Sequence, residues 1–261
     1  MDWRHHEVSW AGGRSIHELL LIGAGLTLCT VDLAQPGAPD IGNAIVYIAA
    51  TLLFTLRFYL ARAIGVGTCI AAIAQQWPHL RYGLDHADMM TLGILPLLGI
   101  VALASPHLAA RFEGASSNLS LLPNPWSSFT TAQTRTLRWS CYAAGALAGL
   151  LDHSLQVCHL ADPPLWPRIA MVAIIISIGA LSLGRSVGLL SLWITGITVA
   201  ILTAPQVFAA EAALAGDIAG AQALIFTGGP HYVLPIVLLA LASAVIATPF
   251  TARLLRRTIA G

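Results

Sequence analysis

Long apolar runs, separated by short polar stretches, dominate this chain. Seven of them predict helices of membrane-spanning length, because about 20 apolar residues cross a bilayer. They cover Ile16–Ala34, Ile41–Leu60, Met89–Ala104, Trp139–Leu151, Ile169–Leu183, Val187–Ala209 and Tyr232–Phe250. A weaker run, Ile64–Ala74, follows the second and leaves open an eighth or a re-entrant element.

The composition agrees with this pattern. The chain has 261 residues, of which 57% are hydrophobic and 10% are charged, whereas a soluble domain carries roughly 25% charged residues. Such a chain has too little polar surface to cover itself, so lipid is its expected solvent. We therefore predict an all-α polytopic membrane protein of about seven transmembrane helices in one domain. Residues 1–75 would form a first helix pair and residues 76–261 a five-helix bundle.

The charge distribution bears on function class and on orientation. All 13 basic residues are arginine, and a retinal Schiff base needs a lysine amine, so a rhodopsin is excluded. Membrane proteins carry their excess of basic residues on the cytoplasmic side. Both ends of the chain would then lie there, which conflicts with seven crossings. The arginines concerned are Arg4, Arg14, Arg57 and Arg62 early in the chain and Arg253, Arg256 and Arg257 at its end.

Ionisable side chains are costly within a membrane, so each is a candidate functional residue. Glu18 lies in the first apolar run. Dense His and carboxylate side chains are typical of a metal or proton site, but a solvated helix end has the same composition. We therefore treat them as possible functional polar residues and predict no catalytic, cofactor or metal residue. The other candidates lie at the ends of later runs: Asp85, His86 and Asp88, and Asp152 with His153.

Several short stretches follow one another in a set order along the chain. They are Gly25-Leu26-Thr27-Leu28, Leu80-Arg81-Tyr82-Gly83, Pro106-His107-Leu108, Pro123-Asn124-Pro125 and Asp152-His153-Ser154-Leu155. With the close first two runs and the long polar loop His107–Arg138, this layout resembles subunit III of the haem-copper cytochrome c oxidases. The family's acidic residue within the third helix is replaced here by Met90-Thr91.

The resemblance implies a non-catalytic integral membrane subunit of a respiratory electron-transport complex. Haem and copper would belong to partner membrane subunits, and this chain would hold no cofactor of its own beyond bound phospholipid. The resemblance places the chain in a bacterial plasma membrane or a mitochondrial inner membrane. No basic stripe with interleaved aromatic residues indicates a nucleic-acid partner.

Two other functions stay open. The copper-dependent methane and ammonia monooxygenases have a membrane subunit with a stretch that looks like Arg62, Thr68, Cys69, Trp77 and Arg81-Tyr82 of this chain. A small transporter or a metal-binding membrane protein is the second alternative, and a transporter predicts internal symmetry between its halves. Copper content would distinguish the first alternative, and solute transport in liposomes the second.

Overall fold

The computed structural model describes residues 7–8, 13–34, 41–75, 93–113, 130–156, 165–182, 187–208 and 232–260. These residues are almost all helical, which confirms the all-α prediction. The two strands β1 (Glu7–Val8) and β2 (Arg14–Ser15) form a short antiparallel hairpin. The helices are α1 (Ile16–Leu33), α2 (Ile41–Thr55), α3 (Tyr59–Gln75), α6 (Leu95–Leu103), α7 (Pro106–Glu113), α8 (Thr131–Gln156), α9 (Trp166–Ser182), α10 (Val187–Thr203) and α13 (Val233–Ala260).

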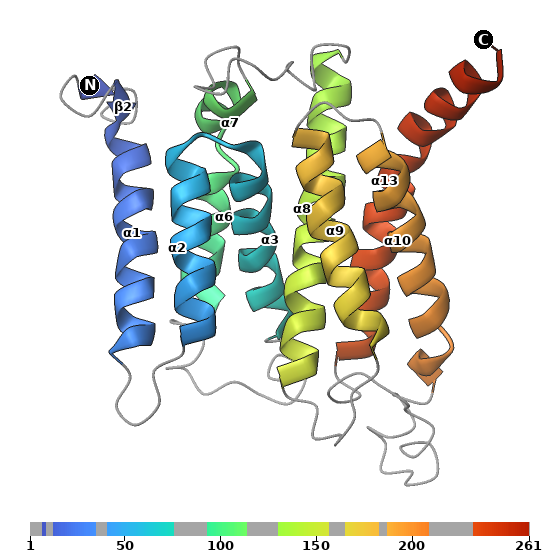
Figure 1. The fold of residues 1–261 in the computed structure, drawn as a ribbon, viewed down its shortest axis with the longest axis horizontal. Coiled ribbons are helices and arrows are strands. Elements are labelled where there is room, and N and C mark those ends of the chain that lie inside the picture. Colours follow the sequence, from blue (N-terminus) through green and yellow to red (C-terminus); the bar gives the residue numbers. More distant parts are fainter. Residues whose placement is uncertain are drawn as a thin grey trace, which may run out of the picture.

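Eight of the described helices stand side by side, and the short α7 lies at one end of them (Figure 1). The hairpin that precedes α1 and the last turns of α13 lie at this same end of the bundle (Figure 1). The weak apolar run Ile64–Ala74 forms the body of α3, a full helix beside α6 and α8. The first 75 residues therefore hold three helices, where the sequence predicted a pair followed by a weaker run.

One close helix contact in the described part of the bundle joins α3 to α8. A Cβ atom added to Gly67 would lie 2.5 Å from the carbonyl carbon of Gly145, and one added to Gly145 would lie 2.9 Å from the Ala63 carbonyl oxygen. Ala63 and Gly67 are four residues apart and share one face of α3, as do Gly145 and Gly149 on α8. Small residues in this spacing let two backbones touch, which is how helices associate in lipid.

The helices that follow α8 are joined by glycine contacts and by hydrogen bonds from side chains. A Cβ atom on Gly196 of α10 would lie 3.0 Å from the Ala240 carbonyl oxygen of α13. The buried Ser140 hydroxyl of α8 donates to the Ser243 carbonyl oxygen of α13 at 2.7 Å. The Ser177 hydroxyl of α9 and the Ser191 hydroxyl of α10 share a hydrogen bond of 2.8 Å. These contacts satisfy polar groups that have no water partner inside an apolar bundle.

Arg62 joins α3 to α6 and to α8. Its side chain is buried, and its Nε donates to the Leu103 carbonyl oxygen at 2.7 Å while its Nη2 donates to the Ser105 carbonyl oxygen at 3.3 Å. Both oxygens lie at the C-terminal end of α6, where a cation is favourable. The guanidinium also lies 5.8 Å from the centre of the Tyr142 ring on α8. Arg62 is thus a structural residue at the end of the bundle that carries the hairpin.

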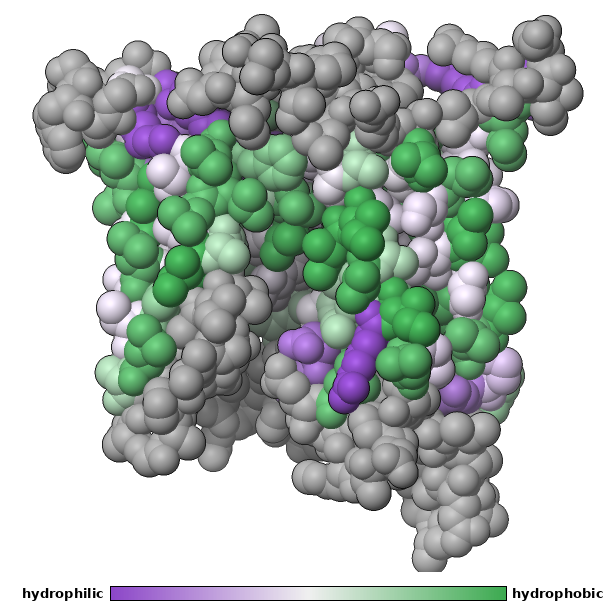
Figure 2. Space-filling view, viewed as in Figure 1, coloured by the Kyte–Doolittle hydropathy of each residue, from purple (hydrophilic) through white to green (hydrophobic). Residues whose placement is uncertain are grey.

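The outer surface of the bundle is apolar between two more polar ends (Figure 2). Large side chains on four different helices face outward, with exposed fractions of 70% for Val101, 63% for Ile176, 66% for Ile201 and 64% for Val245. One described segment, Val233–Arg253, is long and apolar enough to cross a membrane by length and composition, with a mean hydropathy of 2.3. Four further apolar helical segments are shorter: Ile16–Thr27, Tyr59–Ala74, Trp166–Ser182 and Val187–Thr203.

Candidate functional site

The main polar cluster of the described residues surrounds Glu18 at the start of α1. Ser15 and Glu18 form a capping box there, in which each residue binds the backbone of the other. The Ser15 backbone N–H donates to Glu18 Oε2 at 2.9 Å, and the Glu18 backbone N–H donates to the Ser15 hydroxyl at 3.2 Å. This motif fixes the Glu18 carboxylate at the helix end, where its side chain is completely buried.

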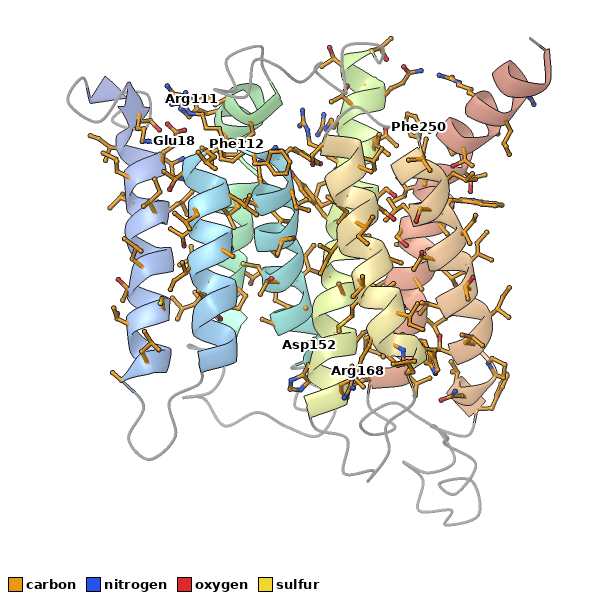
Figure 3. The ribbon with its side chains drawn as sticks, viewed as in Figure 1. Glu18, Arg111, Phe112, Asp152, Arg168 and Phe250 are labelled. Atoms are coloured by element: carbon orange, nitrogen blue, oxygen red, sulfur yellow. The ribbon has the colours of Figure 1, made fainter. Side chains whose placement is uncertain are left out.

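Two arginines from distant parts of the chain bind this carboxylate. Arg57 Nε lies 3.0 Å from Glu18 Oε1, and Arg111 Nη1 lies 3.1 Å from Glu18 Oε2. Both guanidiniums also donate to the Gly13 carbonyl oxygen, from Arg57 at 3.4 Å and from Arg111 at 2.6 Å. Figure 3 shows Glu18 and Arg111 facing one another between α1 and α7. The cluster therefore connects the hairpin, α1, the α2–α3 turn and α7.

Apolar packing under the cluster holds α7 in place. Leu108 and Phe112 of α7 are buried against Phe54 of α2 and Ala61 of α3. The Phe54 and Phe112 rings have centroids 4.7 Å apart, a distance typical of an aromatic pair. Since Phe112 lies on the buried face of α7, the preceding residue Arg111 is directed towards the carboxylate of Glu18.

Arg57 occupies a backbone conformation that glycine normally supplies. Its φ is +55°, and it follows the last turn of α2. The Phe58 N–H donates to the Leu53 carbonyl oxygen and the Arg57 N–H to the Phe54 carbonyl oxygen, both at 2.9 Å, which is the Schellman pattern of a helix end. A side chain here costs backbone energy. The ion pair with Glu18 accounts for an arginine at this position.

Replacing Arg57 would separate the backbone strain of its positive φ from the stabilising ion pair with Glu18. We expect both Arg57→Gly and Arg57→Ala to destabilise the fold, because each removes the ion pair with the buried carboxylate. Arg57→Gly should remain the more stable of the two by about 1 kcal/mol, since glycine adopts a positive φ without strain. Thermal unfolding of the two variants in detergent measures this order. Equal stability, or a more stable alanine variant, would contradict the strained geometry.

A third arginine, Arg14, lies beside the same carboxylate. Its Nη2 donates to the Thr55 carbonyl oxygen at the end of α2. Burial lowers the pKa of Arg14, and the positive charges of Arg57 and Arg111 lower it further, against the opposing effect of Glu18. Among the described side chains, Arg14 is thus a cation beside two other cations and one carboxylate.

A smaller polar group lies at the opposite end of the bundle. His153 Nε2 lies 3.2 Å from the Tyr232 hydroxyl oxygen, and the two rings meet edge to face with centroids 5.2 Å apart. The contact joins the last turn of α8 to the start of α13. Burial raises the pKa of Tyr232, so its hydroxyl stays protonated, and the tautomer of His153 decides which of the two groups donates. Asp152 and Arg168 lie at this same end (Figure 3).

The structure separates the residues that the sequence singled out. Glu18 is buried within an arginine cluster, while Asp152 is exposed and His153 half-buried at the other end. Asp85, His86 and Asp88 lie outside the described residues. Within the described residues, no group of three or more His, Cys, Asp or Glu side chains gathers to hold a metal ion. The sequence does not indicate the partners of Glu18, because Arg57 and Arg111 are 39 and 93 positions away from it. The capping box itself can be recognised in the sequence as Ser15-Ile16-His17-Glu18.

The geometry of the Glu18 cluster is suited to fixing helices and to holding negative charge. Two guanidiniums pair with the carboxylate in a largely buried setting, and a third is left beside them. Comparison of the chain with protein-family models, with curated proteins and with solved structures finds no match.

Proposed function

We propose that this chain is an integral membrane protein that crosses the bilayer eight times. The observation that carries the proposal is the apolar outer surface of the bundle, with the described charged side chains gathered at its two ends (Figure 2). A soluble protein rarely exposes large contiguous apolar patches. In lipid, by contrast, outward Val101, Ile176, Ile201 and Val245 side chains are stably placed.

Six of the eight helices are long enough to fit this proposal, whereas the described helices α2 and α6 are shorter, with 15 and 9 residues. Helices α3, α9 and α10 each have 17 residues, about 25 Å at 1.5 Å per residue, which lies within the range of spanning helices. The longer α13 contains Pro249, and its last turns diverge from the bundle axis (Figure 1). A proline inside a helix produces such a bend.

The arginines give the proposed orientation. Arg168 is the one described arginine at the end that carries Asp152 (Figure 3). Eight crossings place both termini on one side, which removes the conflict that seven crossings create. By the positive-inside rule, the end with the termini faces the cytoplasm of a bacterium or the matrix of a mitochondrion. The described arginines at that end are Arg14, Arg57, Arg62, Arg111, Arg135, Arg138, Arg253 and Arg256.

Within this membrane frame, we propose that the chain is a non-catalytic subunit of a respiratory complex, as its resemblance to oxidase subunit III implies. Small residues in backbone contact fill the interior, as at Gly67 and Gly145, and this favours a rigid packing role. The family has seven helices, and here α3 adds an eighth. By sequence α3 belongs to the first piece of the two-piece layout, yet it packs mainly on α8 of the second.

Labelling of single cysteines in the full chain tests the topology. Leu165 and Leu255 are both exposed and lie at opposite ends of the bundle. In a background in which Cys29, Cys69, Cys141 and Cys158 are all replaced by serine, Leu165→Cys should react with an impermeant maleimide in spheroplasts. Leu255→Cys should react only after permeabilisation. Reaction of both residues in intact spheroplasts, or release of the chain from membranes by alkaline carbonate, would refute the eight-crossing orientation.

Extraction in a mild detergent tests the subunit role separately. We expect the chain to co-purify with membrane subunits that carry haem and copper, in fixed stoichiometry by mass spectrometry and absorption. A partner-free chain that itself binds stoichiometric haem or copper would refute a non-catalytic role. Copper together with a cupredoxin-like partner would favour the monooxygenase alternative, and solute uptake by the isolated chain in liposomes would favour a transporter.

A further inference from the structure

Positive charge exceeds negative charge among the described side chains of the cluster around Glu18. Among the described side chains, the guanidiniums of Arg14, Arg57 and Arg111 surround this single carboxylate. Ser15, Arg57 and Arg111 already occupy the carboxylate oxygens. Arg14 instead donates from its Nη2 to the neutral Thr55 carbonyl oxygen, so its positive charge has no carboxylate of its own within the described cluster.

One end of the Arg14 guanidinium has no acceptor among the described residues. Its Nη1 is buried and makes no hydrogen bond within the described part of the chain. Buried donors are nearly always satisfied, and a charged donor costs more to leave unsatisfied than a neutral one. The lowered pKa of Arg14 has the same origin, since burial and two neighbouring arginines act on it together.

The surroundings of Arg14 resemble the edge of a membrane. Leu20, at the start of α1 beside the cluster, has 58% of its surface exposed, and Leu56, next to Arg57, has 48% exposed. Figure 2 shows hydrophilic side chains at this corner directly above apolar ones. The first turn of α1 adds the positive end of a helix dipole. A ligand bound here would contact the guanidiniums at the end of the bundle and, next to them, the apolar side of the bundle.

We propose that Arg14, with Arg57 and Arg111 beside it, binds a phosphate group at this end of the bundle. A phosphate presents several oxygens to the planar forks of guanidiniums, which match phosphate geometry better than a lysine amine does. Two sources share this chemistry: the headgroup of an anionic phospholipid, and free inorganic phosphate. The lipid source rests on the proposed membrane insertion, because basic sites between helices on the cytoplasmic side bind lipid headgroups. The inorganic source does not depend on it.

The purified full chain in a neutral detergent provides the test. Its thermal unfolding is followed while phosphatidylglycerol, phosphatidylcholine or inorganic phosphate is titrated in. We expect saturable stabilisation by phosphatidylglycerol and none by phosphatidylcholine, which identifies an anionic headgroup. Saturable stabilisation by inorganic phosphate at equal ionic strength would identify the free anion instead. No stabilisation by either would overturn the proposal while leaving the topology result untouched.

Variants locate the site. Arg14→Gln keeps donors but loses the charge, and it spares the Arg57 and Arg111 pairs with Glu18, so the chain should still fold. We expect it to weaken binding about tenfold, while Arg14→Lys retains more of the affinity. Arg253→Gln removes an exposed arginine at the same end of the bundle and should change nothing. Equal losses in Arg14→Gln and Arg253→Gln would show diffuse attraction and refute the site.

Discussion

Gly67→Leu is expected to prevent α3 from packing on α8 and to destabilise the bundle by about 3 kcal/mol or more. Even the first carbon of the new side chain would lie 2.5 Å from the Gly145 carbonyl carbon and 2.6 Å from the Ala146 nitrogen. Those neighbours are backbone atoms, which cannot rotate away. The contact joins α3 to α8, so its loss would separate these two helices. Size-exclusion profiles and thermal unfolding in detergent measure the effect.

A matched control is available on α1. A Cβ atom on Gly23 would meet nothing within 4 Å, so Gly23→Leu adds the same atoms to a helix without a clash. It should be neutral or slightly stabilising, since leucine favours a helix over glycine. The stability of Gly67→Ala should lie between those of the wild type and Gly67→Leu, because its single added carbon already contacts backbone atoms of α8. Equal stability of Gly23→Leu and Gly67→Leu would refute the close contact.

The same contact explains why α3 appears in the sequence only as a weaker apolar run, left open as an eighth or a re-entrant element. Apolar runs identify helices by hydropathy, and every long run of this kind that lies in the described residues is helical. The segment within α3 is weak because Gly65, Gly67, Ala71 and Ala72 take the place of large apolar residues. Small residues lower hydropathy at the positions where two helices touch. A helix inside the bundle therefore gives a weaker signal than one that faces outward.

The candidate site was only partly predictable for a different reason. Glu18 is a carboxylate in an apolar run, and that alone marks it. Its environment, however, depends on Arg57 in a left-handed turn and on Arg111 in a helix that lies at the end of the bundle. No local periodicity relates these positions to residue 18. Ion pairs between distant segments follow from the packing of the helices, which the pattern of one sequence does not specify.

Glu18→Gln should destabilise the fold by about 3 kcal/mol, because removing one partner of a buried ion pair leaves the others uncompensated. The amide has nearly the same shape and can still accept the Ser15 N–H, so the capping box loses little. What is lost is the negative charge between Arg57 and Arg111, at 3.0 Å and 3.1 Å. Thermal unfolding in detergent and limited proteolysis of the hairpin measure the change.

A double-mutant cycle with Arg111 shows whether the loss is electrostatic. Arg111→Gln alone should cost less than Glu18→Gln, since Arg57 still pairs with the carboxylate and the surplus of positive charge falls. Glu18→Gln leaves two cations without their carboxylate partner, and the double variant removes one of them, Arg111. The destabilisation of the double variant should therefore be smaller than the sum of the single effects by about 1–2 kcal/mol. Strict additivity would mean that Glu18 stabilises the fold through its cap of α1, and that the two charges act independently.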